Sequence, residues 1–149
     1  MKIGFVWREK ITMGIEENKA VVKKVFDNFT VVNFDKALEV IADDATWTLV
    51  GDPRRFHYAG AKNKAGFAEQ VKGFLGIMAK FRWVPNVITA EDDRVSVEAE
   101  SFGELADGKK YHNFYHMMFV LRGGKIQTVR EYLDPLEVLE FTGEMTFPG

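Results

Sequence analysis

Glu131 is the side chain of this sequence best suited to acid–base chemistry, because it stands on an apolar face of an expected strand. The stretch Ile126–Leu133 reads as a strand, and alternation places Glu131 on the same side as Val129 and Leu133. A carboxyl group in a partly dry pocket has a raised pKa, which suits proton transfer near neutral pH. We therefore expect Glu131 to be a general acid or base. The alternative is a carboxylate at an open rim or one held by a neighbouring strand.

The preceding strand, expected over Lys110–Leu121, supplies two further candidates on opposite faces. One face carries Asn113, Tyr115, Met117, Phe119 and Leu121; the other carries His112, Phe114, His116, Met118 and Val120. Both faces are largely apolar, so periodicity does not decide which one looks inward. We expect Tyr115 inside, as a hydrogen-bond donor beside Glu131. In the reverse assignment His116 becomes the pocket base, because its pKa suits proton transfer near pH 7.

Helical spacing of apolar residues predicts the elements that hold these candidates. Helices are expected over about Asn18–Val32, after Asn33, and over Lys64–Lys80. The third contains three glycines that each cost about 1 kcal/mol relative to alanine, so it needs tertiary packing or a close approach of its backbone to something. A closing helix follows Asp134, which is a good N-cap, and Glu137 is placed to complete a capping box.

From residue 81 onward the apolar period changes to two, which indicates strands. We expect strands over residues 45–50, 81–90, 94–102, 110–121 and 126–133, with Pro85 confining the second to an edge or a bulge. Arg54–Lys64 reads as a polar loop. Helices followed by a meander of antiparallel strands predict an α+β fold in which a curved sheet wraps a long helix. Such a cone is open at one end, where it can hold a small ligand.

Four stretches in this order resemble the SnoaL-like and ketosteroid-isomerase-like branch of the nuclear transport factor 2-like superfamily. They are IADDATWTLV, DRVSVEAES, YHNFYHMMFVLRGGKI and VREYLDPLEV, and the resemblance spans about Glu16 to Phe141. It implies one domain over residues 16–143, with an extension before it (1–15) and a tail after it (144–149). The extension is either an upstream addition or an extra strand built from Ile3, Phe5 and Trp7.

The resemblance also shows which of the family's usual catalytic residues are missing. Ketosteroid isomerases use an Asp base on the first strand and a Tyr on the first helix; Leu49 and Val25 match those positions here. Epoxide hydrolases of this fold place Tyr and Asn on the first strand, where this chain has Trp47 and Leu49. Of their acidic residues only the last is retained, as Glu131. The usual chemistry of both groups is therefore not expected.

Aromatic side chains supply the expected wall of a ligand site, since the chain has 13 Phe and 3 Trp. We expect a small apolar ligand to contact Trp47, Leu49, Tyr58, Phe67, Trp83, Asn113, Met117 and Val129. Aromatic residues at this spacing are also typical of a core, so both uses stay open. Three scattered histidines do not predict a metal site, and the absence of a glycine-rich phosphate loop leaves no cofactor expected.

Composition limits the remaining possibilities. A chain of 149 residues fits one domain, and a net charge of -2 gives no footprint for nucleic acid or an anionic membrane. Without cysteine there is no disulfide and no thiol nucleophile, and a cytoplasmic location is expected. The apolar outer face of the long strand predicts a homodimer.

Two functions follow from these expectations. The first is a cofactor-free isomerase, cyclase or dehydratase that acts on a small apolar carbonyl or hydroxyl compound. The second is a dimeric small-ligand-binding or accessory domain that has lost the base.

Overall fold

The structure is a computed structural model that describes the backbone of residues 2–148 and the side chains of residues 14–148. Its elements in chain order are α1 (Lys2–Asn28), α2 (Phe34–Leu38), β1 (Ile41–Leu49), β2 (Gly60–Asn63), α3 (Lys64–Gly76), β3 (Met78–Glu91), β4 (Arg94–Leu105), β5 (Lys110–Arg122), β6 (Lys125–Leu133) and α4 (Pro135–Thr142). The strands form one sheet in the order β2-β1-β6-β5-β4-β3. Only the β1–β6 pair is parallel. The predicted α+β cone with a curved, mostly antiparallel sheet is confirmed.

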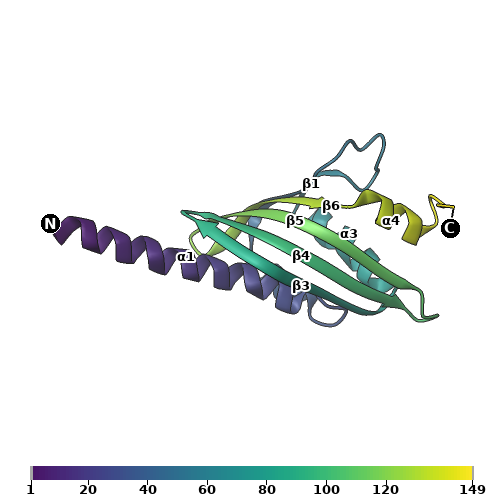
Figure 1. The fold of residues 1–149 in the computed structure, drawn as a ribbon, viewed down its shortest axis with the longest axis horizontal. Helices are drawn as coiled ribbons and strands as arrows, with labels where there is room; N and C mark the ends of the chain where they lie inside the picture. Colours follow the sequence, from purple (N-terminus) through teal and green to yellow (C-terminus); the bar gives the residue numbers. More distant parts are fainter. Residues whose placement is uncertain (1, 149) are drawn as a thin grey trace.

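The C-terminal part of α1 and the helix α3 lie against one side of the curved sheet, the N-terminal part of α1 projects beyond it, and α4 follows its last strand (Figure 1). On α1, Val22, Val25 and Phe26 are fully or almost fully buried, and the ring of Phe26 lies 4.8 Å from that of Trp83 on β3. On α3, the ring of Phe67 stacks on Trp47 of β1 at 3.9 Å. The two helices therefore cover different parts of the inner face, and the core is rich in aromatic contacts.

The first helix differs from the expectation at both ends. Residues 2–12 continue α1 as helix, so the extra strand proposed for Ile3, Phe5 and Trp7 does not form; the side chains of residues 1–13 lie outside the described part. At the other end α1 stops at Asn28, and Val32 is 86% exposed in a turn. The turn is held by the Asn33 N–H, which donates to Thr30 Oγ1 at 3.1 Å.

The first strand starts earlier than expected and pairs with a strand that was not expected, because both contain polar residues that weaken the apolar alternation. The strand β1 begins at Ile41 and includes Asp43 and Asp44, which are exposed and bind Lys64 (3.1 Å) and Gln127 (2.9 Å). The short strand β2 lies in the predicted polar loop and pairs with β1. The helix α3 ends at Gly76 rather than Lys80, because β3 starts at Met78.

The edge position expected for Pro85 is confirmed. The strand β3 forms one edge of the sheet, and its register shifts between Pro85 and Val87. Proline has no N–H for a ladder, so an edge bulge tolerates it without losing a hydrogen bond.

The start of α4 is fixed by two side chains rather than by a capping box. Asp134 caps the helix by accepting the Leu136 N–H at 3.0 Å, as expected. Glu137 does not return a bond to the cap; the Asp134 N–H instead donates to Asn113 Oδ1 on β5 at 3.1 Å. Asn113 Nδ2 donates to the Asp134 carbonyl at 3.0 Å. The long strand and the closing helix are thus held together by one buried amide.

Replacing Asp134 with Ala removes the cap and should lower the free energy of unfolding by about 1 kcal/mol. Asp134→Asn keeps an accepting oxygen and should stay close to the parent protein. Urea unfolding of both variants measures the difference. An equal loss in the Asn variant would show that the carboxylate charge, and not the cap, stabilises this helix.

Candidate functional site

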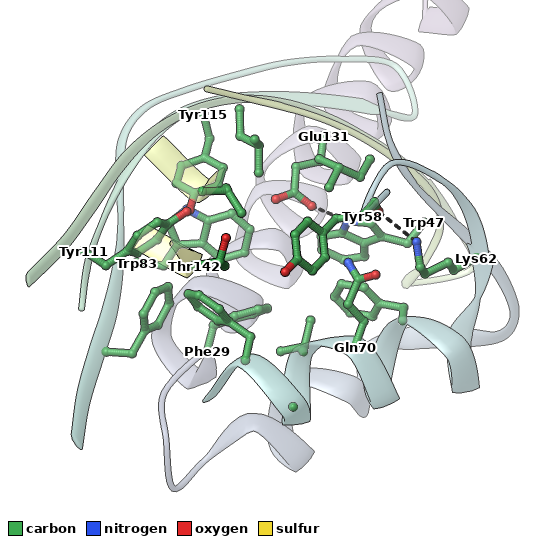
Figure 2. Close-up of a pocket in the computed structure, with 18 of the residues that line it drawn as sticks. Phe29, Trp47, Tyr58, Lys62, Gln70, Trp83, Tyr111, Tyr115, Glu131 and Thr142 are labelled. Atoms are coloured by element: carbon green, nitrogen blue, oxygen red, sulfur yellow. Dashed lines mark hydrogen bonds between the residues drawn. The ribbon is translucent and has the colours of Figure 1, made fainter. Parts of the chain in front are cut away.

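A cavity of about 370 Å³ lies between α3, the inner face of the sheet and the segment that carries Phe56 and Tyr58 (Figure 2). Ten of its 21 lining residues are aromatic: Phe29, Trp47, Phe56, Tyr58, Phe67, Phe74, Phe81, Trp83, Tyr111 and Tyr115. The polar groups in the wall include Lys62, Gln70, Glu131 and Thr142. A concave apolar site with a few converging polar groups is typical of small-molecule binding.

Glu131 stands in this wall and is held by one indole. The N–H of Trp47 donates to Glu131 Oε2 at 2.6 Å. The contact follows from the parallel pairing of β1 with β6, which sets Leu49 beside Glu131 and Trp47 beside Val129, so that all four side chains share the inner face. The second carboxylate oxygen has no hydrogen-bond partner among residues 14–148 and is free for a ligand.

The environment of Glu131 raises its pKa to about 7, from an ordinary value of 4.5. Burial is the main cause, because the apolar wall disfavours the charged carboxylate. The hydrogen bond from Trp47 and the positive charge of Lys62 act in the opposite direction but do not offset burial. The acid and base forms of Glu131 are therefore both present near neutral pH.

Two phenols from β5 lie in the same wall. Tyr115 Oη is 2.9 Å from Ser101 Oγ and 3.3 Å from Tyr111 Oη, which also accepts a 2.8 Å hydrogen bond from Asn113 Nδ2. Burial raises the pKa of Tyr111 to about 12 and that of Tyr115 well above its usual range. Both phenols thus stay protonated and can donate hydrogen bonds.

The segment beside the cavity is tied to the chain after α4. Glu144 accepts hydrogen bonds from the Tyr58 hydroxyl (2.9 Å) and the Thr142 hydroxyl (2.8 Å) and lies 2.8 Å from His57 Nε2. These bonds depress the pKa of Glu144. Tyr58 is therefore held in place from outside the cavity, because its hydroxyl donates its hydrogen bond to Glu144.

Gly73 of α3 lines the cavity, and a Cβ built there would meet no atom within 4 Å. No close approach of the backbone to another group therefore requires this glycine.

The structure brings seven of the predicted site residues together in the cavity wall and leaves four outside it. Those in the wall are Trp47, Leu49, Tyr58, Phe67, Trp83, Tyr115 and Glu131. Asn113, Met117 and Val129 face inward but are buried in the core, away from the cavity. His116 lies on the outer face of the sheet, with its Nε2 2.8 Å from Ser96 Oγ, so the assignment that made it the pocket base is wrong.

Several wall residues were missed from the sequence. Tyr111 has the same strand parity as Tyr115, and extending the inner face by one more residue pair would have found it. Lys62 and Gln70 carry no such signal, because the polar sequence of β2 predicts a loop and Gln70 is one of several polar residues of α3.

The pattern of the SnoaL-like domain matches residues 22–129 of this chain. The chain belongs to the SnoaL-like domain family. No curated protein sequence matches it. The family assignment agrees with the cone-shaped fold and covers every strand up to the middle of β6.

Solved structures of this SnoaL-like fold are similar in shape and distant in sequence. TerC co-crystallized with polyporic acid is 17% identical with a TM-score of 0.72, covering 85% of this chain and 98% of that one. A phenazine biosynthesis-related protein from Pseudomonas aeruginosa is 20% identical with a TM-score of 0.75, covering 95% and 94%. A putative polyketide cyclase from Xanthomonas campestris pv. campestris is 20% identical with a TM-score of 0.69, covering 85% and 97%.

No helix in the described part has both the length and the apolar character needed to cross a membrane. Within the same residues, no three His, Asp or Glu side chains are grouped so that they could share a metal ion.

Replacing Glu131 with Gln should stabilise the protein at alkaline pH. The folded-state pKa of about 7 lies above the ordinary 4.5, so ionising Glu131 costs the folded state, and stability falls as the pH rises through this window. Glutamine stays neutral and can still accept the Trp47 N–H. We expect a gain of about 2–3 kcal/mol near pH 8 and almost none near pH 4.

Thermal unfolding of both proteins at the two pH values measures this gain. Glu98→Gln, an exposed glutamate on the outer face, is the matched control and should change neither midpoint. A Glu131→Gln gain that does not depend on pH would show that burial does not raise the pKa of this carboxyl.

Proposed function

We propose that this SnoaL-like protein is an enzyme that moves a proton within a small apolar carbonyl compound, without a cofactor. The observation that carries the proposal is the position of Glu131: a carboxyl with a pKa of about 7, fixed by the Trp47 N–H and open to an aromatic cavity. A base whose pKa lies near the working pH is the most effective at proton transfer in both directions.

The chemistry begins with a carbonyl compound bound in the cavity. The free oxygen of Glu131 removes a proton from the carbon next to the carbonyl, and the electron pair moves to the carbonyl oxygen to give an enolate. A tyrosine phenol in the wall donates a hydrogen bond to that oxygen and stabilises the developing charge. Returning the proton to another carbon completes an isomerisation. In an aldol-type cyclisation the enolate carbon attacks a second carbonyl, whose oxygen takes up the proton held by Glu131. In a dehydration the enolate expels a β-hydroxyl, which takes that proton from Glu131 and leaves as water.

The fold relatives support a small organic ligand. One of them was crystallised with polyporic acid and another is a putative polyketide cyclase. The substrate class proposed here rests on this chain's own wall, which combines one titratable carboxyl with phenolic donors in an otherwise apolar space.

The direct test is exchange of the α-protons of 2-tetralone, a ring-fused ketone, with D2O, followed by NMR. The rate for the parent protein should rise with pH through about 7, because the base form of Glu131 acts. Glu131→Gln should lower the rate by about 100-fold or more. Glu98→Gln on the outer face is the control. Exchange catalysed equally well by the Glu131→Gln variant would remove Glu131 from the mechanism.

The second candidate is a binding domain that holds an apolar ligand without turnover. It is favoured by Leu49 and Val25, which stand where the resemblance to ketosteroid isomerases places the base and the helix tyrosine. A ligand that raises the melting temperature but undergoes no exchange, with or without Glu131, would support this candidate over the enzyme.

The cytoplasmic location expected from the sequence stays a prediction.

We also propose a homodimer formed through the outer face of the sheet. This face carries Phe114 and Tyr132, which are 53% and 44% exposed, beside the exposed His116. Large apolar side chains at this exposure on neighbouring strands are typical of an interface. A symmetric pair would cover the patch with its own copy.

Introducing charge at this patch tests the dimer. The double variant Phe114→Glu, Tyr132→Glu should sediment as a monomer at a concentration at which the parent protein sediments as a dimer. Val32→Glu, at the exposed turn between α1 and α2, is the matched control. A parent protein that is monomeric at high micromolar concentration would contradict the proposal.

A further inference from the structure

The polar network around Tyr115 leaves at least one phenolic O–H without an acceptor in the described part of the chain. Its members are Ser101, Tyr111, Asn113 and Tyr115; Ser101 and Asn113 are fully buried, and the two phenols line the cavity. Buried polar groups are almost always paired, so an unpaired O–H at the cavity wall calls for an acceptor from elsewhere. The direction of each bond can be worked out from the partners.

Asn113 must donate to Tyr111. Its Oδ1 accepts the backbone N–H groups of Phe114 (2.7 Å) and Asp134 (3.1 Å), and its Nδ2 donates to the Asp134 carbonyl (3.0 Å). These three contacts allow only one orientation of the amide. The 2.8 Å contact with Tyr111 Oη is therefore made by an N–H, and Tyr111 is the acceptor.

Ser101 must donate to Tyr115. Its side chain has Tyr115 Oη, at 2.9 Å, as its one hydrogen-bond partner among residues 14–148. If Tyr115 were the donor, the Ser101 proton would be buried without an acceptor, at a cost of about 1–3 kcal/mol. The favourable arrangement makes Tyr115 the acceptor.

Each phenol thus accepts a bond from a residue outside the cavity and keeps its own proton. The single contact between the phenols, at 3.3 Å, uses at most one of the two protons and is long for an O–H···O bond. Glu131 bonds to neither phenol, although its negative charge contributes to the raised pKa of both. The N–H of Trp83, whose ring lies 4.9 Å from that of Tyr115, is buried without an acceptor among the same residues.

We propose that Tyr111 and Tyr115 form a two-donor clamp for a single oxygen atom of the ligand, with Asn113 and Ser101 as the positioning residues that orient the two phenols. The clamp deepens the proposed function by naming the substrate group, and it rests on the cavity being a small-molecule site but not on catalysis by Glu131. A bound oxygen with two lone pairs replaces the long internal contact with two donated bonds. Figure 2 shows both phenols on the same side of the cavity.

The phenols and the carboxyl in the wall determine which kind of ligand oxygen fits the clamp. Two neutral O–H donors suit the oxygen of a ketone or a phenol, each of which can accept two bonds. They also suit an enolate oxygen, which forms only when Glu131 has taken up a proton and become neutral. A carboxylate ligand would add a second negative charge to a cavity that already holds Glu131. The substrate class is therefore a ring-sized apolar molecule with one carbonyl or phenol-type oxygen at the end where Tyr111 and Tyr115 lie.

Calorimetric titration with 2-naphthol and 2-methylnaphthalene tests the clamp, because the two probes have nearly the same shape and differ in one oxygen. The parent protein should bind 2-naphthol at least about tenfold more tightly. Tyr111→Phe and Tyr115→Phe should each weaken 2-naphthol binding by roughly five- to tenfold and leave 2-methylnaphthalene within about twofold. Unchanged binding of the methyl probe also shows that each variant is folded.

The positioning residues and the control complete the test. Ser101→Ala should weaken 2-naphthol binding by a smaller factor, about threefold, and leave the methyl probe unaffected. Tyr132→Phe, which removes a phenol from the outer face, is the control and should not change the preference for oxygen.

The clamp is overturned if the parent protein shows no preference for 2-naphthol, including the case in which it binds neither probe. It is also overturned if Tyr111→Phe and Tyr115→Phe weaken both probes equally. The readout does not involve Glu131, so a failed exchange assay with 2-tetralone would leave the clamp intact as the recognition element of a binding domain. If the titrations disprove the clamp, the role of Glu131 is still tested separately by the exchange assay with 2-tetralone.

Discussion

The contact between Trp47 and Glu131 is the constraint on which the rest of the site depends. A carboxyl in an aromatic wall is expensive to ionise, and a single 2.6 Å bond from an indole lowers that cost without abolishing it. The result is a pKa near 7 rather than a permanently charged or permanently neutral group. The bond requires β1 and β6 to be neighbours in parallel register, so the one parallel pair of the sheet is also the pair that positions the acid.

The strand β5 links this acid to the rest of the fold. Its inner residues differ in role along the strand. Phe119 and Met117 are buried in the core. Tyr115 and Tyr111 line the cavity, and Asn113 holds the start of α4. The same amide that anchors α4 also fixes the direction of the hydrogen bond to Tyr111. Closing the cone with α4 and orienting a phenol in the cavity are thus consequences of one buried side chain.

Strand alternation predicted the side on which Glu131 lies, because its face of β6 is apolar and the opposite face is polar. On β5 it predicted which residues share a face with Tyr115 but not that this face looks inward, since both faces are largely apolar. It did not distinguish the cavity from the core: Met117 and Val129 share the correct face but lie too deep to reach the empty space. Periodicity also gave no sign of β2, whose four residues contain no apolar alternation, and so it missed Lys62. Depth along a strand depends on which helix covers it, which only the assembled fold reveals.

The proposed role of Glu131 as the base is compatible with the register of the parallel pair, although the resemblance to ketosteroid isomerases places that base at position 49. The Cα atoms of Leu49 and Glu131 are paired across β1 and β6, and both side chains line the cavity. A carboxyl on β6 at this level therefore reaches the same region of the cavity as one on β1 would. The leucine removes a second carboxyl that would otherwise repel Glu131, and it adds apolar surface that keeps the remaining carboxyl dry. With the acid on β6 instead of β1, a carboxyl with a pKa of about 7 still stands in this part of the cone. The first strand then supplies its hydrogen-bond donor, Trp47.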